Sequence, residues 1–163
     1  MKTLHLETLI HAPVERCFDL SRSIDLHKLS TAKTEEEAIA GKMSGLIGLG
    51  ESVTWKARHF GVMQKMTVEI TDFDTPVYFQ DQMSKGIFKS FRHEHFFEAK
   101  GENCLMKDLL VFEAPLGRLG KLAEKWVLGD YLRKLLLERN ELIKIFAESE
   151  RWCELAGMES KKM

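Results

Sequence analysis

The middle of the chain constrains the fold most, because it is a succession of runs in which polar and apolar residues alternate. Alternation with a period of two is typical of a β-strand with one buried face. Short connections carrying Gly61, Gly86 and Gly101 separate these runs, and such connections join antiparallel neighbours. The sequence therefore predicts an antiparallel meander with one apolar face. The runs are residues 51–60, 63–73, 77–84, 87–99 and 103–113.

The N-terminal part adds two strands and two short helices to this meander. Residues 2–11 alternate partly in the manner of a strand, and residues 34–41 predict another, although glutamates are poor strand formers. Between them, Pro13 stands at a helix start and is followed by apolar residues at helical spacing. Residues 23–30 predict a second short helix. We therefore expect a sheet of about seven strands.

The last third of the chain predicts one long amphipathic helix over residues 118–152, because its apolar residues recur at steps of three and four. Gly129 and Asp130 mark a possible bend. The sheet and the helix each have one apolar surface, so a curved sheet wrapped around the helix buries both. A curved sheet leaves a gap along a straight helix, which side chains fill or which remains as a cavity. The apolar stripe is Leu122, Trp126, Tyr131, Leu135, Leu142 and Phe146.

Length and charge narrow the class of protein further. A chain of 163 residues is most simply one domain, which we place at residues 1–152, with a flexible tail at 153–163. A net charge of −1 provides no overall field that would attract nucleic acid. No stretch predicts a membrane span or a signal peptide, and three widely separated cysteines favour a reducing compartment. We expect a cytoplasmic protein with no nucleic-acid partner and no integral membrane segment.

The order of these elements resembles the helix-grip fold of the SRPBCC superfamily, which includes START domains, Bet v 1 and polyketide cyclase/dehydrase-like proteins. The opening "LETLIHAPVERCFDLSRSIDLHKLS" resembles the first strand and helix of that superfamily. The segments "WKARHFG", "FQDQMSKGIFKSFRHEHFF" and "MKDLLVFEAPLGRLG" are similar to its small bacterial ligand-binding members. The resemblance covers nearly the whole chain. It implies an α+β fold, with a hydrophobic ligand held between the concave face of the sheet and the C-terminal helix.

Strand alternation predicts which side chains face that cavity. A shift of one residue in the first meander strand would bury Lys56 and Arg58, and a shift in the fourth would bury Arg92 and Glu94. Burying those charges unpaired costs more than burying neutral imidazoles that find hydrogen-bond partners. The predicted lining is thus mostly apolar with a few polar groups, as in small-molecule pockets. Its strand residues are Trp55, His59, Met66, Val68, Phe79, Asp81, Phe91, His93, His95, Met106 and Asp108, and the helical stripe adds Trp126 and Tyr131.

The polar members of this set allow several interpretations. His59 fits a hairpin cap, both carboxylates fit salt bridges or solvated positions, and the other two histidines fit either neutral core residues or ligand contacts. His93 and His95 would face the same way on one strand and could chelate a metal ion. A catalytic zinc site needs a third protein ligand, which His59, Asp81 or Asp108 would have to supply. Because spacing fixes none of the three, we predict no metal and no cofactor.

Three functions remain open on the sequence. The first is a binding protein for a small hydrophobic or amphipathic molecule, lipid or polyketide-like, whose polar head meets the histidines. The second is a cofactor-independent cyclase or dehydratase that uses a His/Asp pair for acid–base chemistry in the same cavity. The third is a protein-interaction domain without a ligand. No nucleophile or phosphate-binding motif selects among them, and the sequence identifies no catalytic residue.

Overall fold

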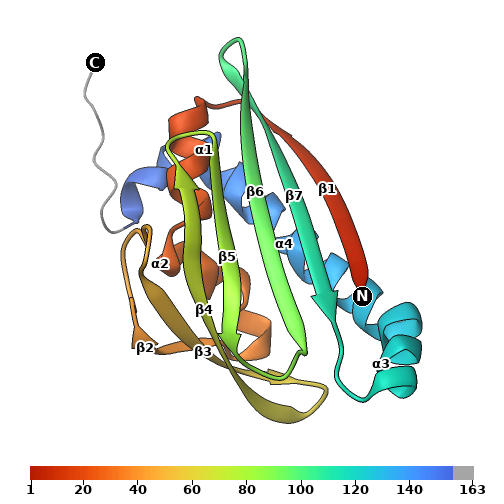
Figure 1. The fold of residues 1–163 in the computed structure, drawn as a ribbon. Helices are drawn as coiled ribbons and strands as arrows, with labels where there is room; N and C mark the ends of the chain where they lie inside the picture. The colour runs from red at the N-terminus through yellow and green to blue at the C-terminus, as the bar shows by residue number, and fades with distance from the viewer. Residues whose placement is uncertain (156–163) are drawn as a thin grey trace.

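The computed structural model describes residues 1–155, which form a curved antiparallel sheet with helices on its concave side (Figure 1). The sheet has seven strands in the order β1-β7-β6-β5-β4-β3-β2. The predicted meander is confirmed, and β1 closes against β7 at one edge. The strands are β1 (Lys2–Ile10), β2 (Glu37–Gly41), β3 (Ser52–His59), β4 (Val62–Asp74), β5 (Tyr78–Lys85), β6 (Ser90–Lys100) and β7 (Asn103–Glu113).

Two groups of helices pack against this sheet. The two short helices after β1 are confirmed as α1 (Val14–Ser21) and α2 (Ile24–Ser30), followed by the short 3-10 helix η1 (Ala32–Thr34). The long C-terminal helix runs diagonally behind the sheet and packs against α1, α2 and β1 (Figure 1). The fold is thus the predicted helix-grip arrangement. The C-terminal helices are α3 (Gly117–Ala123), the π-helical stretch η2 (Glu124–Leu128), α4 (Gly129–Ala147) and the 3-10 helix η3 (Glu150–Glu154).

The first part of the C-terminal helix departs from the prediction. The expected irregularity is present, since η2 ends directly before Gly129. However, the apolar stripe does not face the sheet at this end: Trp126 is 67% exposed, and Leu122 is also exposed. α3 lies beyond the end of β7 (Figure 1), where the sheet offers no apolar surface to cover. The placement of Trp126 in the cavity wall was therefore wrong.

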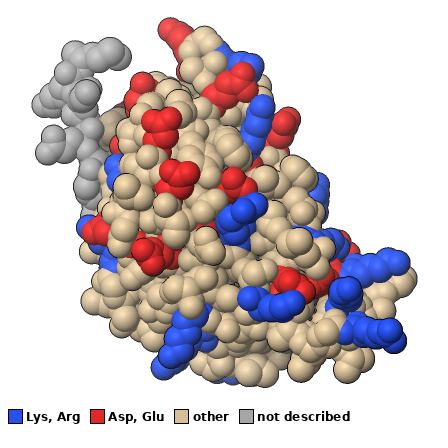
Figure 2. Space-filling view, viewed as in Figure 1, with Lys and Arg blue, Asp and Glu red and all other residues tan. Residues whose placement is uncertain are grey.

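The outer surface of α3 combines apolar and basic side chains. Leu116 and Leu119 are exposed there, the latter by 72%, and Arg118 and Lys121 stand beside them in the chain. Figure 2 shows several Lys and Arg side chains gathered at this end of the molecule, whereas charges of both signs are mixed elsewhere on the same face.

No helix among residues 1–155 is long and apolar enough to cross a membrane.

Two hydrophobic clusters form the core on the concave side of the sheet. The larger is centred on Phe18 of α1, and the smaller joins Leu4, Phe112 and Leu136 where α4 crosses β1 and β7. At the C-terminal end, Leu155 is only 6% exposed and belongs to the larger cluster. Packed structure therefore extends past the expected boundary at residue 152, and the rest of the expected tail, 156–163, lies outside the described residues.

Candidate functional site

A cavity of about 290 Å³ lies between the concave face of the sheet and the helices. Its wall is built from inward-facing residues of β3–β6 and from one side of α4, with α2 at one margin. Most of the residues assigned to the lining from the sequence contribute to this wall. They are Trp55, His59, Met66, Val68, Phe79, Asp81, Phe91, His93, His95 and Tyr131.

Three residues of the predicted lining lie elsewhere. Trp126 is on the outer surface of η2, as described above. Met106 and Asp108 do face the concave side of β7, but helices cover them there: Met106 contacts Ser21 of α1, and Asp108 contacts Asn140 of α4. Alternation assigned the correct face to both residues, but it could not show that the helices seal that part of the face.

Sequence reasoning missed a polar group at the α2 margin of the cavity. His27 Nε2 lies 3.0 Å from Glu36 Oε1, and the His27 ring stacks on Trp55 with ring centres 4.3 Å apart. Burial alone would raise the pKa of Glu36, but the charge of His27 and its hydrogen bond outweigh burial and leave this pKa below its ordinary value. No sequence pattern marks these two residues as neighbours, since they meet only through the packing of α2 on β2 and β3.

On the other side of the cavity, strand register assembles a cluster of two histidines and two aspartates. Asp81 of β5 pairs with His93 of β6, and His95 of β6 pairs with Asp108 of β7. All four side chains point to the concave face because of strand alternation. Each imidazole therefore has a carboxylate directly across from it on a neighbouring strand.

The cluster is held together by short polar contacts. His93 Nε2 lies 2.9 Å from Asp108 Oδ1, and His95 Nε2 lies 2.9 Å from Asp81 Oδ2. The second Asp108 oxygen accepts a hydrogen bond of 2.6 Å from the Asn140 amide. Two further approaches are not hydrogen bonds: His95 Nδ1 lies 3.1 Å from Asp108 Oδ1, and His93 Nδ1 lies 4.0 Å from Asp81 Oδ2. Asp108 thus holds one end of the cluster, and Asp81 lies on its cavity side.

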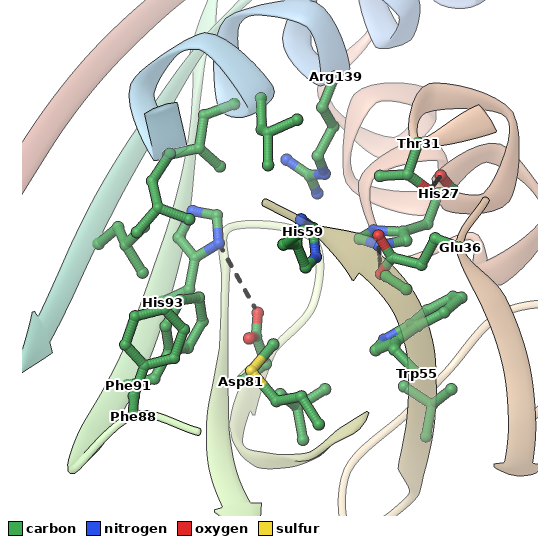
Figure 3. A pocket seen from close by; sticks show the side chains of 18 of the residues that line it. His27, Thr31, Glu36, Trp55, His59, Asp81, Phe88, Phe91, His93 and Arg139 are labelled. Atoms are coloured by element: carbon green, nitrogen blue, oxygen red, sulfur yellow. Dashed lines mark hydrogen bonds and ion pairs between the residues drawn. The ribbon is translucent and has the colours of Figure 1, made fainter. Parts of the chain in front are cut away.

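Arg139 is a further residue that sequence reasoning did not identify. Its guanidinium reaches into the cavity from α4, and Figure 3 shows it opposite the sheet that carries His93 and Asp81. Nη2 donates a 2.8 Å hydrogen bond to the Ser21 carbonyl, and Nη1 lies 3.7 Å from Asp108 Oδ1. A basic residue within an amphipathic helix suggests a solvated face, so its burial follows only from the position of α4.

Burial and neighbouring groups set the charge of the cluster. Burial alone would raise the pKa of Asp108, but the hydrogen bond with His93 and the close approach of the His95 ring outweigh burial and hold this pKa well below the usual range. The pKa of Asp81 is lowered in the same way, against burial, mainly by its hydrogen bond with His95. Burial, followed by the charge of His95, lowers the pKa of His93. The cluster therefore contains two carboxylates and a neutral His93 at neutral pH.

His59 connects the sheet to the C-terminal helix. It is the last residue of β3, and its Nδ1 lies 2.7 Å from the Tyr131 hydroxyl of α4. Its side chain therefore lines the cavity and joins β3 to α4, instead of only capping the hairpin. Burial lowers the pKa of His59, and the negative charge of Glu36 opposes this only in part.

The lowered pKa of His59 predicts a loss of stability in acid. The unfolded chain, with an imidazole pKa near 6.5, binds more protons than the folded chain as the pH falls below about 6.5. We therefore expect His59→Gln to lose less stability than the wild type between about pH 7 and about pH 5. The two proteins should differ by less than about 1 kcal/mol in the stability that they lose, since solvent screens the partly exposed His59 ring. Urea unfolding across this range measures it.

The matched control for this experiment is His5→Gln, because His5 is exposed on the first strand. This variant controls for the general effect of replacing a histidine by glutamine. If His59→Gln keeps the full wild-type dependence, then His59 is as free to accept a proton in the folded protein as in the unfolded chain.

Solved structures similar to this chain have the same architecture. No family model and no curated protein matches the chain. A protein of Thermus thermophilus is 22% identical, with a TM-score of 0.70 over 91% of this chain and 100% of that one. The major latex-like protein 151 of Panax ginseng is 18% identical, with a TM-score of 0.66 over 91% and 98%. A START superfamily protein of Mycobacterium smegmatis is 12% identical, with a TM-score of 0.68 over 88% and 98%. The chain therefore has the helix-grip fold of the SRPBCC, or Bet v 1-like, superfamily.

Proposed function

We propose that the protein binds a small amphipathic molecule in the cavity between the sheet and α4. The observation that carries this proposal is a mostly apolar cavity with polar groups on two opposite sides. Figure 3 shows His93 and Asp81 on one side, and His27 and Glu36 on the other. An apolar wall with a small number of convergent polar groups is typical of small-molecule sites.

The dimensions and chemistry of the cavity narrow the ligand class. A volume of about 290 Å³ lies at the lower limit of small-molecule pockets, so a ring system or one short chain fits better than a diacyl lipid. Arg139 offers donors to a carbonyl or anionic oxygen, whereas Asp81 and Glu36 accept hydrogen bonds from hydroxyl groups. A hydroxylated, polyketide-like molecule with polar groups at both ends matches this distribution better than a fatty acid.

Filling the cavity is expected to weaken this binding strongly. Ala57 of β3 lines the cavity and is 4% exposed, so a phenyl ring at this position would occupy the ligand volume. We expect Ala57→Phe to weaken binding of the fluorescent probe 8-anilinonaphthalene-1-sulfonate by at least about tenfold, a difference of about 1.4 kcal/mol. Fluorescence titration measures the affinity. Native mass spectrometry of wild type and variant, purified from the protein's own host, tests for a retained natural ligand.

The control places the same side chain on the opposite face of the same strand. Lys56 neighbours Ala57 and points to the convex side, so Lys56→Phe should bind the probe as the wild type does. Equal probe binding by Ala57→Phe and the wild type would contradict the proposal and place the probe elsewhere, such as on the exposed leucines of α3. Thermal melting verifies that both variants are folded.

Acid–base catalysis in the same cavity is the second candidate function. It is favoured by one observation: Asp108 holds His93 Nε2 at 2.9 Å while the His93 ring lines the cavity. An imidazole oriented by a carboxylate is the usual arrangement of a general base. Incubation of the ligand found by mass spectrometry with wild type and with His93→Gln distinguishes the two functions. A product formed only by the wild type supports catalysis, and unchanged ligand in both supports binding alone.

A further inference from the structure

We propose that Asp81, His93 and His95 form a binding site for one divalent transition-metal ion, such as Zn²⁺, that opens onto the cavity. This site goes beyond the proposed binding of an organic molecule and does not depend on it. The expectation that no metal is needed rested on the lack of a third ligand fixed by spacing. Strand register now supplies that ligand, because Asp81 lies directly across from His93.

The three side chains are close enough for one ion. One ligand atom from each residue can be chosen so that all three lie within 4.8 Å of one another. Asp81 Oδ2 is 2.9 Å from His95 Nε2 and 4.0 Å from His93 Nδ1. Tetrahedral zinc, with bonds of about 2.0–2.1 Å, needs ligand atoms roughly 3.3 Å apart. Shifts of under about 1 Å in side chains at the cavity wall would meet this requirement.

The far side of the cluster places one carboxylate beside the outer nitrogens of both rings, and His93 already has the hydrogen bond that metal sites require. A histidine that binds a metal almost always donates its other ring N–H to a carboxylate or carbonyl. Asp108 Oδ1 lies 2.9 Å from His93 Nε2 and 3.1 Å from His95 Nδ1, so one carboxylate faces the outward nitrogen of both rings. Asn140 fixes that carboxylate through its other oxygen at 2.6 Å.

One nitrogen in the cluster also lacks a partner without an ion. His95 Nδ1 is buried and makes no hydrogen bond to any atom of residues 1–155, because its approach to Asp108 is poorly aligned. In the hydrogen bond to Asp81, His95 Nε2 serves as the donor. With an ion bound at Nε2, the ring proton would lie on Nδ1, where the Asp108 carboxylate could accept it.

The charge of the cluster also favours a cation. Arg139 lies near Asp108, but within the described part of the chain no Lys or Arg nitrogen lies within 4.0 Å of Asp81. The Asp81 side chain is only 17% exposed, and a carboxylate that is largely removed from water needs a compensating charge or several donors. A divalent ion on the cavity side of Asp81 would provide that charge.

The donor set indicates which ion and which role. Two imidazoles and one carboxylate suit zinc and other first-row transition metals better than magnesium or calcium. Because all three residues line the cavity, the fourth position would be open to it. An open fourth position is the property of zinc sites that bind a water or a substrate oxygen. The ion would therefore hold a carbonyl or hydroxyl oxygen of a cavity ligand.

The test is metal binding by untagged protein that has been stripped with a chelator. We expect one Zn²⁺ per chain by calorimetry, and Co²⁺ should give the intense visible absorption bands of a tetrahedral site. His93→Ala, His95→Ala and Asp81→Ala should each weaken binding by more than about 100-fold. Asp108→Asn, which keeps all three metal ligands but disturbs the carboxylate behind the rings, should weaken it by about 10–100-fold. His27→Ala removes a cavity histidine on the opposite side and should leave the affinity within about threefold of wild type.

Two results would overturn the site. One is wild-type protein that takes up no Zn²⁺ or Co²⁺ at ion concentrations of about 100 µM, which is weak for an N/O site. The other is folded ligand variants that bind as the wild type does, which would place the ion elsewhere. If an alanine variant does not fold, Asp81→Asn keeps the side-chain shape and must still shift the Co²⁺ spectrum. Ala57→Phe separates this proposal from ligand binding, since it blocks the cavity but removes no metal ligand.

Discussion

Asp108→Ala is expected to lower the free energy of unfolding by about 3–5 kcal/mol, the range found when one partner of a buried charged network is removed. The variant would remove the acceptor of His93 and of the Asn140 amide at once. It would also leave the nearby Arg139 guanidinium without its carboxylate, in a position that is 7% exposed. The loss is large because water cannot replace these partners in the sealed space under α4.

Equilibrium urea unfolding in the presence of a chelator, followed by tryptophan fluorescence, measures this loss without contribution from a metal. Asp81→Ala is the matched control: it removes a carboxylate of the same cluster that is partly exposed and makes one hydrogen bond to His95. Asp81→Ala should lower the free energy of unfolding by about 1–3 kcal/mol. A loss under about 1 kcal/mol for Asp108→Ala would show that the cluster rearranges freely and that Asp108 does not hold it together.

Phe18→Ala is expected to lower the free energy of unfolding by about 3–5 kcal/mol, as is found for other buried phenylalanines. Phe18 of α1 is 1% exposed, and its ring meets three rings of the sheet edge-on. The ring centres lie 5.2–5.6 Å apart, at favourable separations for such pairs. The alanine variant would leave a void between α1 and the sheet that these neighbours cannot fill. The three partner rings are Phe73, Phe79 and Phe97.

Phe96→Ala is the matched control, since Phe96 adjoins Phe97 on β6 but faces the convex side and is 37% exposed. Among residues 1–155 its ring pairs only with that of Tyr78, with centres 5.0 Å apart, and its loss should lower the free energy of unfolding by under about 1.5 kcal/mol. Thermal or urea unfolding of both variants gives the comparison. Similar costs for the two variants would show that α1 is not a principal anchor of the sheet.

The candidate site shows which of its features strand alternation can predict. The residues that line the cavity from β3, β5 and β6 follow from a period of two, together with the high cost of burying Lys56 or Arg92. This reasoning placed Asp81, His93 and His95 on one face. It could not place Asp81 opposite His93, because register depends on how two strands are aligned and not on either strand alone.

Helix periodicity predicted the buried positions of the C-terminal helix less well. It identified the C-terminal helix but assigned Trp126 to the buried side, because an apolar stripe does not state how much of a helix the sheet covers. Conversely, Arg139 reads as a solvated residue in the sequence, although α4 buries its guanidinium beside Asp108. The meeting of His27 and Glu36 depends in the same way on the packing of α2.

The sequence by itself determined the order of the elements, the antiparallel sheet and the inward face of each cavity strand, because local periodicity and the cost of burying charge act within one segment. Only the tertiary structure decided which polar groups meet. Strand register brought Asp81 to His93 and Asp108 to His95, and α4 sealed Asp108 from water with Asn140. These contacts join residues from separate elements, so they depend on how whole elements pack, which no single segment of the chain encodes.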